Sequence, residues 1–280
     1  MDYIGRTPAP PLDRFIDDIY CLTGVPRHRT LNVPPMPSAH LMINVGRPIR
    51  LLDPDPAVPP AMFTDGWFMG VWTRRFVIEY PRAVRVAGVH FKPWGLSSFI
   101  DLPMSELRDR WLPIDAVWPG SSDRLLHQVA AATSTEETLR VLEDELRSRL
   151  APAPKRGLEL VRLTAGRLEA AWGGVSIGAL TESVGVSGNH LATQFTSHLG
   201  VTPKRVARIY RFARVILAVD PVHPVDWAQL AHAAGYFDQA HFSKEFKDFT
   251  GQTPTGYLAL RRRFPAITGF PPDQGPMPLD

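Results

Sequence analysis

The chain reads HLATQFTSHLGVTPKRV over residues 190–206 and HFSKEFKDFTGQTPTGY over residues 241–257, and the two stretches repeat one pattern. Six matched pairs lie 51 residues apart: His190 and His241, Leu191 and Phe242, Phe195 and Phe246, Gly200 and Gly251, Thr202 and Thr253, and Pro203 and Pro254. Upstream the separation falls to 50, as Gly185 and Gly235 show, and a turn tolerates such an insertion. The match predicts one small structural unit that is used twice.

Each copy has the pattern of two short helices joined by a turn. In the first copy Ser176 is a good N-cap residue, and Leu180 and Val184 follow it at helical spacing. Gly185 suits a left-handed stop, and Ser187 is placed to cap a second helix. A plain helical hairpin has the same local pattern, but the duplication favours a helix-turn-helix, whose second helix enters the major groove of DNA.

The second copy carries the most specific signature in the chain, GYFDQAHFSKEFKDFTGQTPTGY over residues 235–257. This stretch resembles the DNA-binding domain of the AraC/XylS family of transcription regulators. The family pattern there has Gly-Phe, a following aromatic residue, Ser-x-x-Phe-Lys and Gly-x-Thr-Pro. The resemblance covers residues 175–258 and implies an all-α domain with two helix-turn-helix units joined by a linker helix.

Helical position gives the candidate DNA contacts. Base-reading residues are expected early on each second helix, on the face opposite the buried apolar residues. The candidates, which match the family's base-contacting positions, are Ser187, Gly188, Asn189, Thr193 and Gln194 in the first copy, and Gln239, Ala240, His241, Ser243 and Lys244 in the second. Ala192 and Thr193 are short where long polar side chains are common, so we expect weaker base reading by the first copy.

A helix from Pro203 to about Val219 is expected between the two copies. Lys204, Arg205 and Arg208 lie close together in its first turns. They are expected to contact phosphate, although a merely solvated basic face has the same pattern. This helix would hold the two reading helices about one turn of DNA apart, roughly 34 Å, so that they read successive major grooves.

The basic charge of the chain is concentrated on the repeated region. Residues 155–265 hold 14 Lys and Arg against 8 Asp and Glu, whereas residues 1–154 hold 17 against 18. A basic domain beside a nearly neutral one fits a phosphate backbone as its partner. We expect double-stranded DNA as the main partner, and the family resemblance implies RNA polymerase as another.

The first 150 residues predict a mainly antiparallel β domain. Segments rich in Val, Ile, Phe and Trp between Gly, Pro and Asp predict strands over residues 40–45, 48–52, 66–80 and 83–91. Residues 1–38 read as irregular, with a short helix over 13–21. A helical pair follows the strands, and Ser134 and Glu137 form a capping box within it. The expected fold class is therefore α+β.

The order of these elements also resembles full-length AraC/XylS regulators. Their N-terminal domain is a cupin-like barrel that senses a ligand or mediates dimerisation, and HFKPWG at residues 90–95 is similar to a motif of one branch of such domains. The resemblance thus implies a small-molecule effector and a homodimer as possible partners. Trp67, Trp72, Trp94 and Trp111 are candidates to line an apolar effector pocket, although a core role is the commoner one.

The chain is expected to divide at a proline-containing linker. Residues 1–150 would form the sensor or dimerisation domain, 151–157 the linker and 158–264 the DNA-binding domain, which begins with a helix over Leu158–Trp172. Residues 265–280 hold five prolines in 16 positions and are expected to be a disordered tail.

No pattern of catalytic or metal-binding residues stands out. His28, His40, His90 and His127 are isolated, whereas a metal-binding cupin needs ligands that converge. We expect no enzyme activity, metal or cofactor. The alternative is a ligand-binding module, or a DNA-directed enzyme with an appended helical reader. The specific enzyme variant considered, a DNA-repair methyltransferase, would need a reactive thiol. The single cysteine, Cys21, lies in no active-site motif and fits a reducing cytoplasm.

Two absences concern the membrane. No apolar run approaches 18 residues, and the first residues, MDYIGRTPAP, lack the apolar core of a signal peptide. We therefore expect a cytoplasmic protein with no membrane partner.

Overall fold

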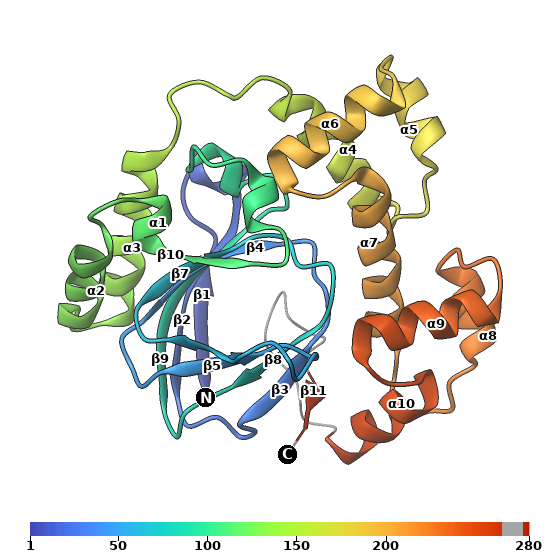
Figure 1. Cartoon of the computed structure of the whole chain (residues 1–280), viewed down its shortest axis with the longest axis horizontal. Helices are drawn as coiled ribbons and strands as arrows, with labels where there is room; N and C mark the ends of the chain where they lie inside the picture. Colours follow the sequence, from blue (N-terminus) through green and yellow to red (C-terminus); the bar gives the residue numbers. More distant parts are fainter. Residues whose placement is uncertain (265–276, 280) are drawn as a thin grey trace.

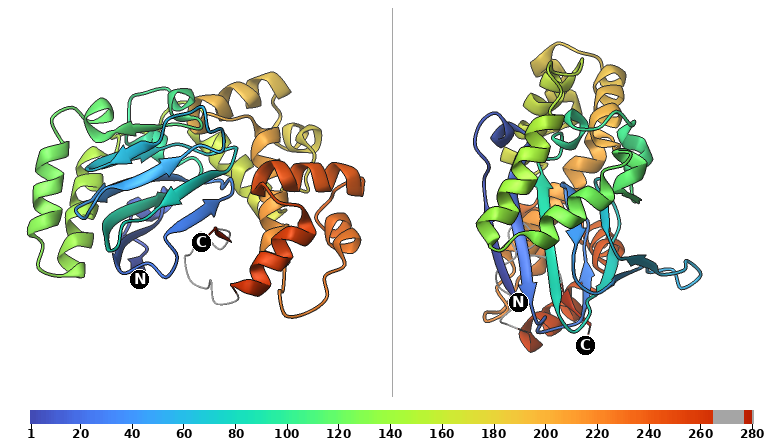
Figure 2. Two further views of the ribbon diagram at one scale, coloured as in Figure 1. Left: turned by 60° about the horizontal axis from the view of Figure 1, so that its bottom comes forward. Right: turned by 90° about the vertical axis from the view of Figure 1, so that its left-hand side faces the viewer.

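A computed structural model describes residues 1–264 and 277–279 of the chain. The N-terminal part forms nearly all of two antiparallel sheets, and residues 158–264 form helices and the segments that connect them (Figure 1). A pair of helices covers one side of the sheets, and the C-terminal helices lie along the other side (Figure 2). This arrangement confirms the expected α+β class, with antiparallel β structure first and an all-α region after it.

The strands form a sandwich that closes around an apolar interior. The larger sheet has the order β1 (Asp2–Arg6), β2 (Ile16–Gly24), β9 (Val84–Phe91), β4 (Ala39–Asn44), β7 (Gly66–Met69) and β10 (Trp111–Pro113). The smaller sheet has the order β11 (Met277–Pro278), β3 (Thr30–Val33), β8 (Phe76–Glu79), β5 (Ile49–Leu52) and β6 (Ala61–Phe63). Short helical turns lie at Leu12–Arg14, Leu96–Ser98, Met104–Leu107 and α1 (Ile114–Val117).

Three of the strand predictions are confirmed, because β4, β5 and β9 lie where the apolar segments predict them. The segment 66–80 is two strands, β7 and β8, which lie in different sheets. The prediction of a helix over 13–21 is wrong, since Ile16–Gly24 is a strand. The prediction that residues 1–38 are otherwise irregular is also wrong, because β1 and β3 lie within them. Strand β2 pairs with both β1 and β9 and is buried on both faces, so its apolar residues run together without the alternation of a half-buried strand.

The tail was predicted to be disordered, and most of that prediction, residues 265–276 and 280, lies outside the described residues. Residues 277 and 278 instead form β11, which pairs with β3.

The outer face of the larger sheet packs against α2 (Ser122–Ala131) and α3 (Thr135–Arg149). The capping box predicted at the start of α3 is present in part: the Ser134 side chain accepts from the Glu137 amide at 3.2 Å. The Glu137 carboxylate accepts from the amide of Thr133, one residue further out, at 2.8 Å. The predicted helical pair thus covers the outer face of the larger sheet.

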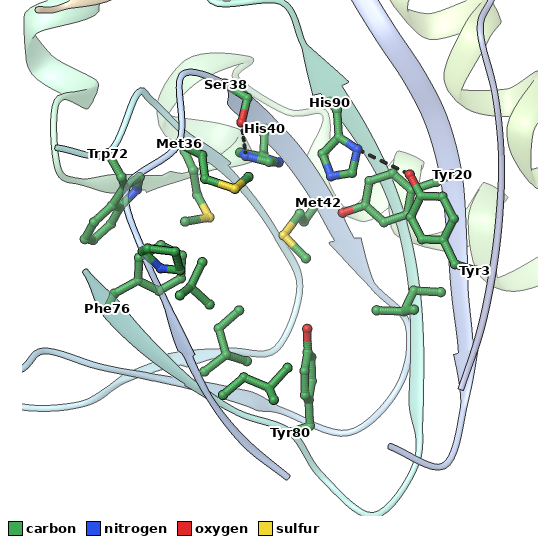
Figure 3. Close-up of a pocket in the computed structure, with 16 residues that line it drawn as sticks. Tyr3, Tyr20, Met36, Ser38, His40, Met42, Trp72, Phe76, Tyr80 and His90 are labelled. Atoms are coloured by element: carbon green, nitrogen blue, oxygen red, sulfur yellow. Dashed lines mark hydrogen bonds between the residues drawn. The ribbon is translucent and has the colours of Figure 1, made fainter. Parts of the chain in front are cut away.

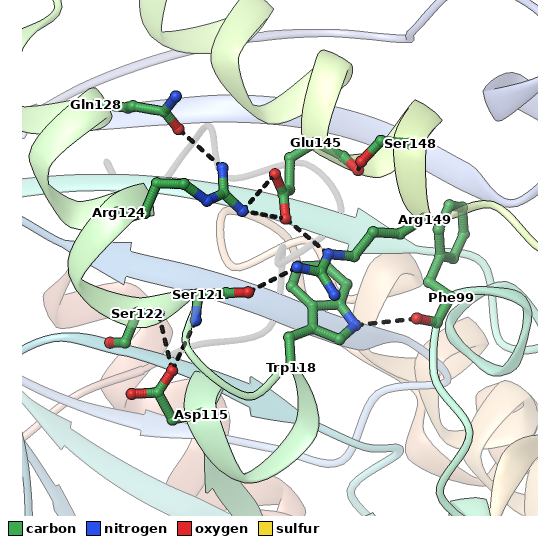
Figure 4. A network of polar contacts seen from close by, with 10 residues as sticks. All are labelled: Phe99, Asp115, Trp118, Ser121, Ser122, Arg124, Gln128, Glu145, Ser148 and Arg149. Atoms are coloured by element: carbon green, nitrogen blue, oxygen red, sulfur yellow. Dashed lines mark hydrogen bonds and ion pairs between the residues drawn. The ribbon is translucent and has the colours of Figure 1, made fainter.

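An ion-pair network fixes α2 against α3 (Figure 4). The buried carboxylate of Glu145 accepts from Arg124 at 2.8 Å and from Arg149 at 2.6 Å. The Arg149 guanidinium also lies 4.4 Å above the ring centre of Trp118. Burial alone would raise the pKa of Glu145, but the hydrogen bonds from both arginines lower it below its usual value.

Seven helices follow residue 157 in the described chain. They are α4 (Leu158–Ala170), α5 (Ile177–Val184), α6 (Gly188–Leu199), α7 (Pro203–Ala218), α8 (Trp227–Ala233), α9 (Gln239–Thr250) and α10 (Pro254–Arg263). Helix α7 belongs to two hydrophobic cores: Val206 and Ile209 pack with α4 to α6, and Phe212 and Val215 pack with α8 to α10. It therefore joins the two repeated units as the predicted linker helix. None of the helices in the described part of the chain has the length and hydrophobicity to cross a bilayer.

Candidate nucleic-acid interface

Capping side chains set both repeated units. Ser187 starts α6 by accepting from the amide of His190 at 3.2 Å, and Asp238 starts α9 by accepting from that of His241 at 2.7 Å. The glycine that ends the first helix of each unit has a positive φ, 67° at Gly185 in the first copy. The sequence thus builds two helix-turn-helix units whose second helices, α6 and α9, are the ones expected to read bases and are here called the reading helices.

On α6 the buried face holds Leu191 and Phe195, both with 0% exposure. Four of the predicted contacts are exposed on the opposite side: Ser187, Gly188, Asn189 and Thr193. The Thr193 hydroxyl donates to the Asn189 carbonyl at 2.9 Å, which leaves its methyl group and the Asn189 amide for a ligand. Gln194 is half-buried, and a Cβ at Gly157 would come within 1.6 Å of its amide oxygen. Its side chain therefore faces the linker, apart from the other four.

On α9 the buried face holds Phe242 and Phe246, again with 0% exposure. The opposite side brings together the exposed residues Gln239, Ala240, His241 and Lys244, with Ser243 half-buried beside them. The first two turns of this helix therefore present an amide, an imidazole and an ammonium group to solvent. These groups supply hydrogen-bond donors and acceptors of the kind that reads base edges.

The three basic residues predicted to meet phosphate differ in their surroundings. Lys204 is exposed. Arg205 donates to the backbone carbonyl of Thr73, and Arg208 forms an ion pair at 2.5 Å with Glu245, which is 1% exposed. The structure thus leaves Lys204 directed to solvent and places the other two side chains in contacts within the protein.

Residues 180–263 match a known family of helix-turn-helix domains. The C-terminal region is an AraC-type helix-turn-helix domain. Such a domain makes the protein a DNA-binding transcription regulator. Residues 6–113 match a domain of unknown function (DUF6597), and none of the curated proteins matches the sequence.

Solved structures of ToxT from Vibrio cholerae are similar to the chain. ToxT from Vibrio cholerae O395 has 13% identity and a TM-score of 0.45, over 86% of this chain and 95% of that chain. A 1.65 Å structure of ToxT from Vibrio cholerae has 9% identity and a TM-score of 0.46, over 92% and 98%. The structure of wild-type ToxT from strain SCE256 with bound unsaturated fatty acid has 12% identity and a TM-score of 0.43, over 86% and 93%. Similarity at this level is too distant to carry detail of the site.

The AraC-type domain contacts the β domain at the ends of both reading helices. At the end of α6, a Cβ at Gly200 would lie 2.4 Å from the carbonyl oxygen of Met104. At the end of α9, a Cβ at the matched Gly251 would lie 2.8 Å from the guanidinium carbon of Arg75. Both glycines have positive φ, 76° and 73°. Matched positions of the two copies therefore both pack against the N-terminal domain, at sites that the sequence alone did not predict.

The β domain holds a small cavity of about 70 Å³ between its two sheets (Figure 3). Its lining is mainly apolar and aromatic, with Met36, Met42, Trp72, Phe76 and Tyr80 among the residues. None of the described residues that line it is Lys, Arg, Asp or Glu. The indole nitrogen of Trp72 is buried and has no hydrogen-bond partner within the described chain. Of the four tryptophans considered from the sequence, only Trp72 lines this cavity.

Two histidines form the polar end of the cavity, and their supposed isolation is wrong. His40 on β4 and His90 on β9 are register partners, with ring centres 4.8 Å apart. The Asp18 carboxylate lies 2.6 Å from Nδ1 of His90, and the Ser38 hydroxyl lies 3.0 Å from Nε2 of His40. Burial, followed by the neighbouring His90, lowers the pKa of His40 well below its usual value. An uncharged His40 therefore faces the cavity.

The thiol required by the alternative enzyme reading is buried. Cys21 on β2 is 6% exposed, and burial raises the pKa of its thiol. A raised pKa and restricted access both lower the reactivity of a cysteine. Among the described residues, no cluster of three or more His, Cys, Asp or Glu side chains has the geometry of a metal site.

Proposed function

We propose that the protein is a sequence-specific, effector-responsive transcription regulator whose reading helices α6 and α9 enter two successive major grooves of DNA. The supporting observation is the exposure of polar side chains in the first two turns of both helices: Asn189 and Thr193 on α6, and Gln239, His241 and Lys244 on α9. In the same proposal residues 1–150 form the sensor domain, 151–157 the linker and 158–264 the DNA-binding domain.

Helix α7 gives the proposed spacing. It has 16 residues, which at 1.5 Å per residue span about 24 Å. The first unit packs on its N-terminal half and the second on its C-terminal half. A separation of this order, with the widths of the two units added, fits reading helices about one DNA turn apart, roughly 34 Å. Lys204, at the start of α7, is the proposed phosphate contact between them.

The cavity of the β domain is the proposed effector site. Because none of the described residues that line it carries a charged side chain and His40 is uncharged, it suits an uncharged apolar molecule with a hydrogen-bonding group for Ser38 or the Trp72 indole. Pro34, Met36 and Ser38 line both this cavity and a second one, of about 230 Å³, that reaches α7.

The segment 34–38 is therefore the proposed route between effector and reading helices. It separates the effector cavity from the second cavity, which Tyr210 and Phe212 of α7 also line. An effector that displaces this segment would change the packing of the helix that sets the spacing of α6 and α9. RNA polymerase and a second copy of the chain are further partners in this proposal, and they rest on the family resemblance.

The test is a selection of bound sequences from a random DNA library by the full chain. We expect two specified blocks whose centres lie about 10–10.5 base pairs apart. Asn189→Ala should relax preference in one block and Gln239→Ala in the other. One specified block that neither substitution changes would show that the proposed placement of α6 and α9 is wrong.

A further inference from the structure

One residue of the second copy has no counterpart in the first. The N-caps of the two reading helices, Ser187 and Asp238, lie 51 residues apart. The glycines in the preceding turns, Gly185 and Gly235, lie only 50 apart. The extra residue therefore lies between Gly235 and Asp238, immediately before α9.

The packing of the two turns identifies Phe237 as the extra residue. In the first copy Val186 follows the glycine and packs against the core of its unit. In the second copy Tyr236 takes that place: it is 4% exposed, its ring lies 5.2 Å from that of Phe242, and its hydroxyl donates to Glu245 at 2.8 Å. Phe237 is left in solvent with 97% of its surface exposed.

A structural role within the unit does not account for Phe237. An apolar residue just before an N-cap often packs on the fourth residue of the helix, which in α9 is Phe242. That contact is already made by Tyr236. The residues that follow Phe237 are Asp238 and the exposed Gln239 and Ala240, which are among the expected base contacts. A large apolar ring thus projects from the turn that a helix-turn-helix brings close to DNA.

We propose that Phe237 is a specificity residue that packs against the 5-methyl group of a thymine in the groove read by α9. The inference rests on the proposed function, because α9 must enter the major groove for the contact to form. The benzyl side chain has no hydrogen-bonding group, so it cannot read donors or acceptors on base edges. The thymine methyl is the apolar group that the major groove displays, and phenylalanine is among the side chains that contact it.

Replacing thymine by uracil (deoxyuridine) tests the contact, since uracil keeps the hydrogen-bonding groups of thymine and lacks only the methyl group. With the full chain and the best site from the library selection, each thymine is replaced in turn. The wild-type protein should lose about fourfold in affinity at one thymine, the factor for burial of a methyl-sized group. On the thymine site, Phe237→Ser should bind more weakly than wild type by a similar factor. Replacing that thymine by uracil should not weaken the binding of Phe237→Ser any further. Phe237→Leu, which stays apolar, should keep part of the discrimination.

The matched control is Val25→Ala, which removes an apolar side chain that is 69% exposed on the β domain and should change neither affinity. Thermal unfolding should be the same for all these variants, because the replaced side chains are exposed. The inference would be overturned if, at every position, replacing thymine by uracil lowered the affinity of wild type and of Phe237→Ser by the same factor. So would unchanged DNA binding with impaired transcription, which would assign Phe237 to a protein partner. If the proposed function itself is wrong, a different result distinguishes this case: Gln239→Ala would then keep the sequence preference of wild type.

Discussion

The side-chain amide of Asn32 donates to the backbone carbonyl of Thr250 at 2.8 Å, and this bond ties strand β3 to the end of reading helix α9. Both residues are buried, with 4% and 2% exposure. Arg75 supports the contact by donating to the Asn32 amide oxygen at 3.3 Å. The second reading helix is thus held by the same domain that contains the proposed effector cavity.

Asn32→Ala should loosen this contact, because it leaves the buried carbonyl of Thr250 without its donor. We expect the free energy of unfolding to fall by about 1–3 kcal/mol, the cost of a buried unsatisfied group. Amide hydrogen exchange should rise at the C-terminal end of α9 and stay unchanged in α6. The exposed Asn189→Ala is the control, with a change within about 0.5 kcal/mol. Equal exchange in α9 of wild type and Asn32→Ala would count against the contact.

Lys204 and Arg208 lie on one helix and predict opposite phenotypes. Lys204→Ala should lower the slope of log affinity against log salt by about one unit and leave stability unchanged. Arg208→Ala should destabilise the domain by about 1–3 kcal/mol, since it leaves the buried Glu245 without its ion pair. The figure lies below that for a fully buried pair because the Arg208 side chain is 29% exposed. Salt titrations of binding and urea unfolding measure the two effects, and reversed phenotypes would contradict the assignment.

His40 predicts a dependence of stability on pH. Its pKa is lowered in the folded protein, mainly by burial, so below about pH 6.5 the unfolded chain binds a proton that the folded chain does not. Stability is therefore fully present above about pH 6.5 and falls as the pH drops toward the folded-state pKa. Wild type should lose more stability than His40→Asn between about pH 7 and 5, measured by urea unfolding.

The variant keeps part of this slope, because burial also lowers the pKa of His198. An exposed substitution, His232→Asn, serves as the control and should follow the wild-type curve. If His40→Asn also follows the wild-type curve of stability against pH, His40 is not held uncharged in the folded protein.

The repeated units could be predicted from the sequence because their determinants are local. Ser187 caps α6 by accepting from an amide only three residues along the chain, and Gly185 ends α5 through its own backbone conformation. The pairing of His40 with His90 depends instead on strand register across 50 residues, and the Asn32–Thr250 bond spans 218. No spacing rule in the sequence reaches such contacts. The extra residue before α9 could have been found from the sequence, since the separation of matched residues changes from 50 to 51 there.

The base-reading prediction separates the two copies. Gln239 lies exposed at the start of α9 with an amide that can donate and accept at an adenine edge, so Gln239→Ala should cost about 1–3 kcal/mol and relax preference at one base pair. Asn189→Ala should act about one helical turn of DNA away. Its effect should be smaller, because the neighbouring Thr193 is short and its hydroxyl is already bonded to the Asn189 carbonyl.

Phe246→Ala is the control for folding, since loss of this fully buried ring should cost about 3–5 kcal/mol and unfold the second unit. Library selection with wild type and each variant gives the preferences, and circular dichroism confirms which variants are folded. A folded Gln239→Ala protein that keeps both its affinity and its preference would place the reading surface of the second unit elsewhere than on the first turn of α9.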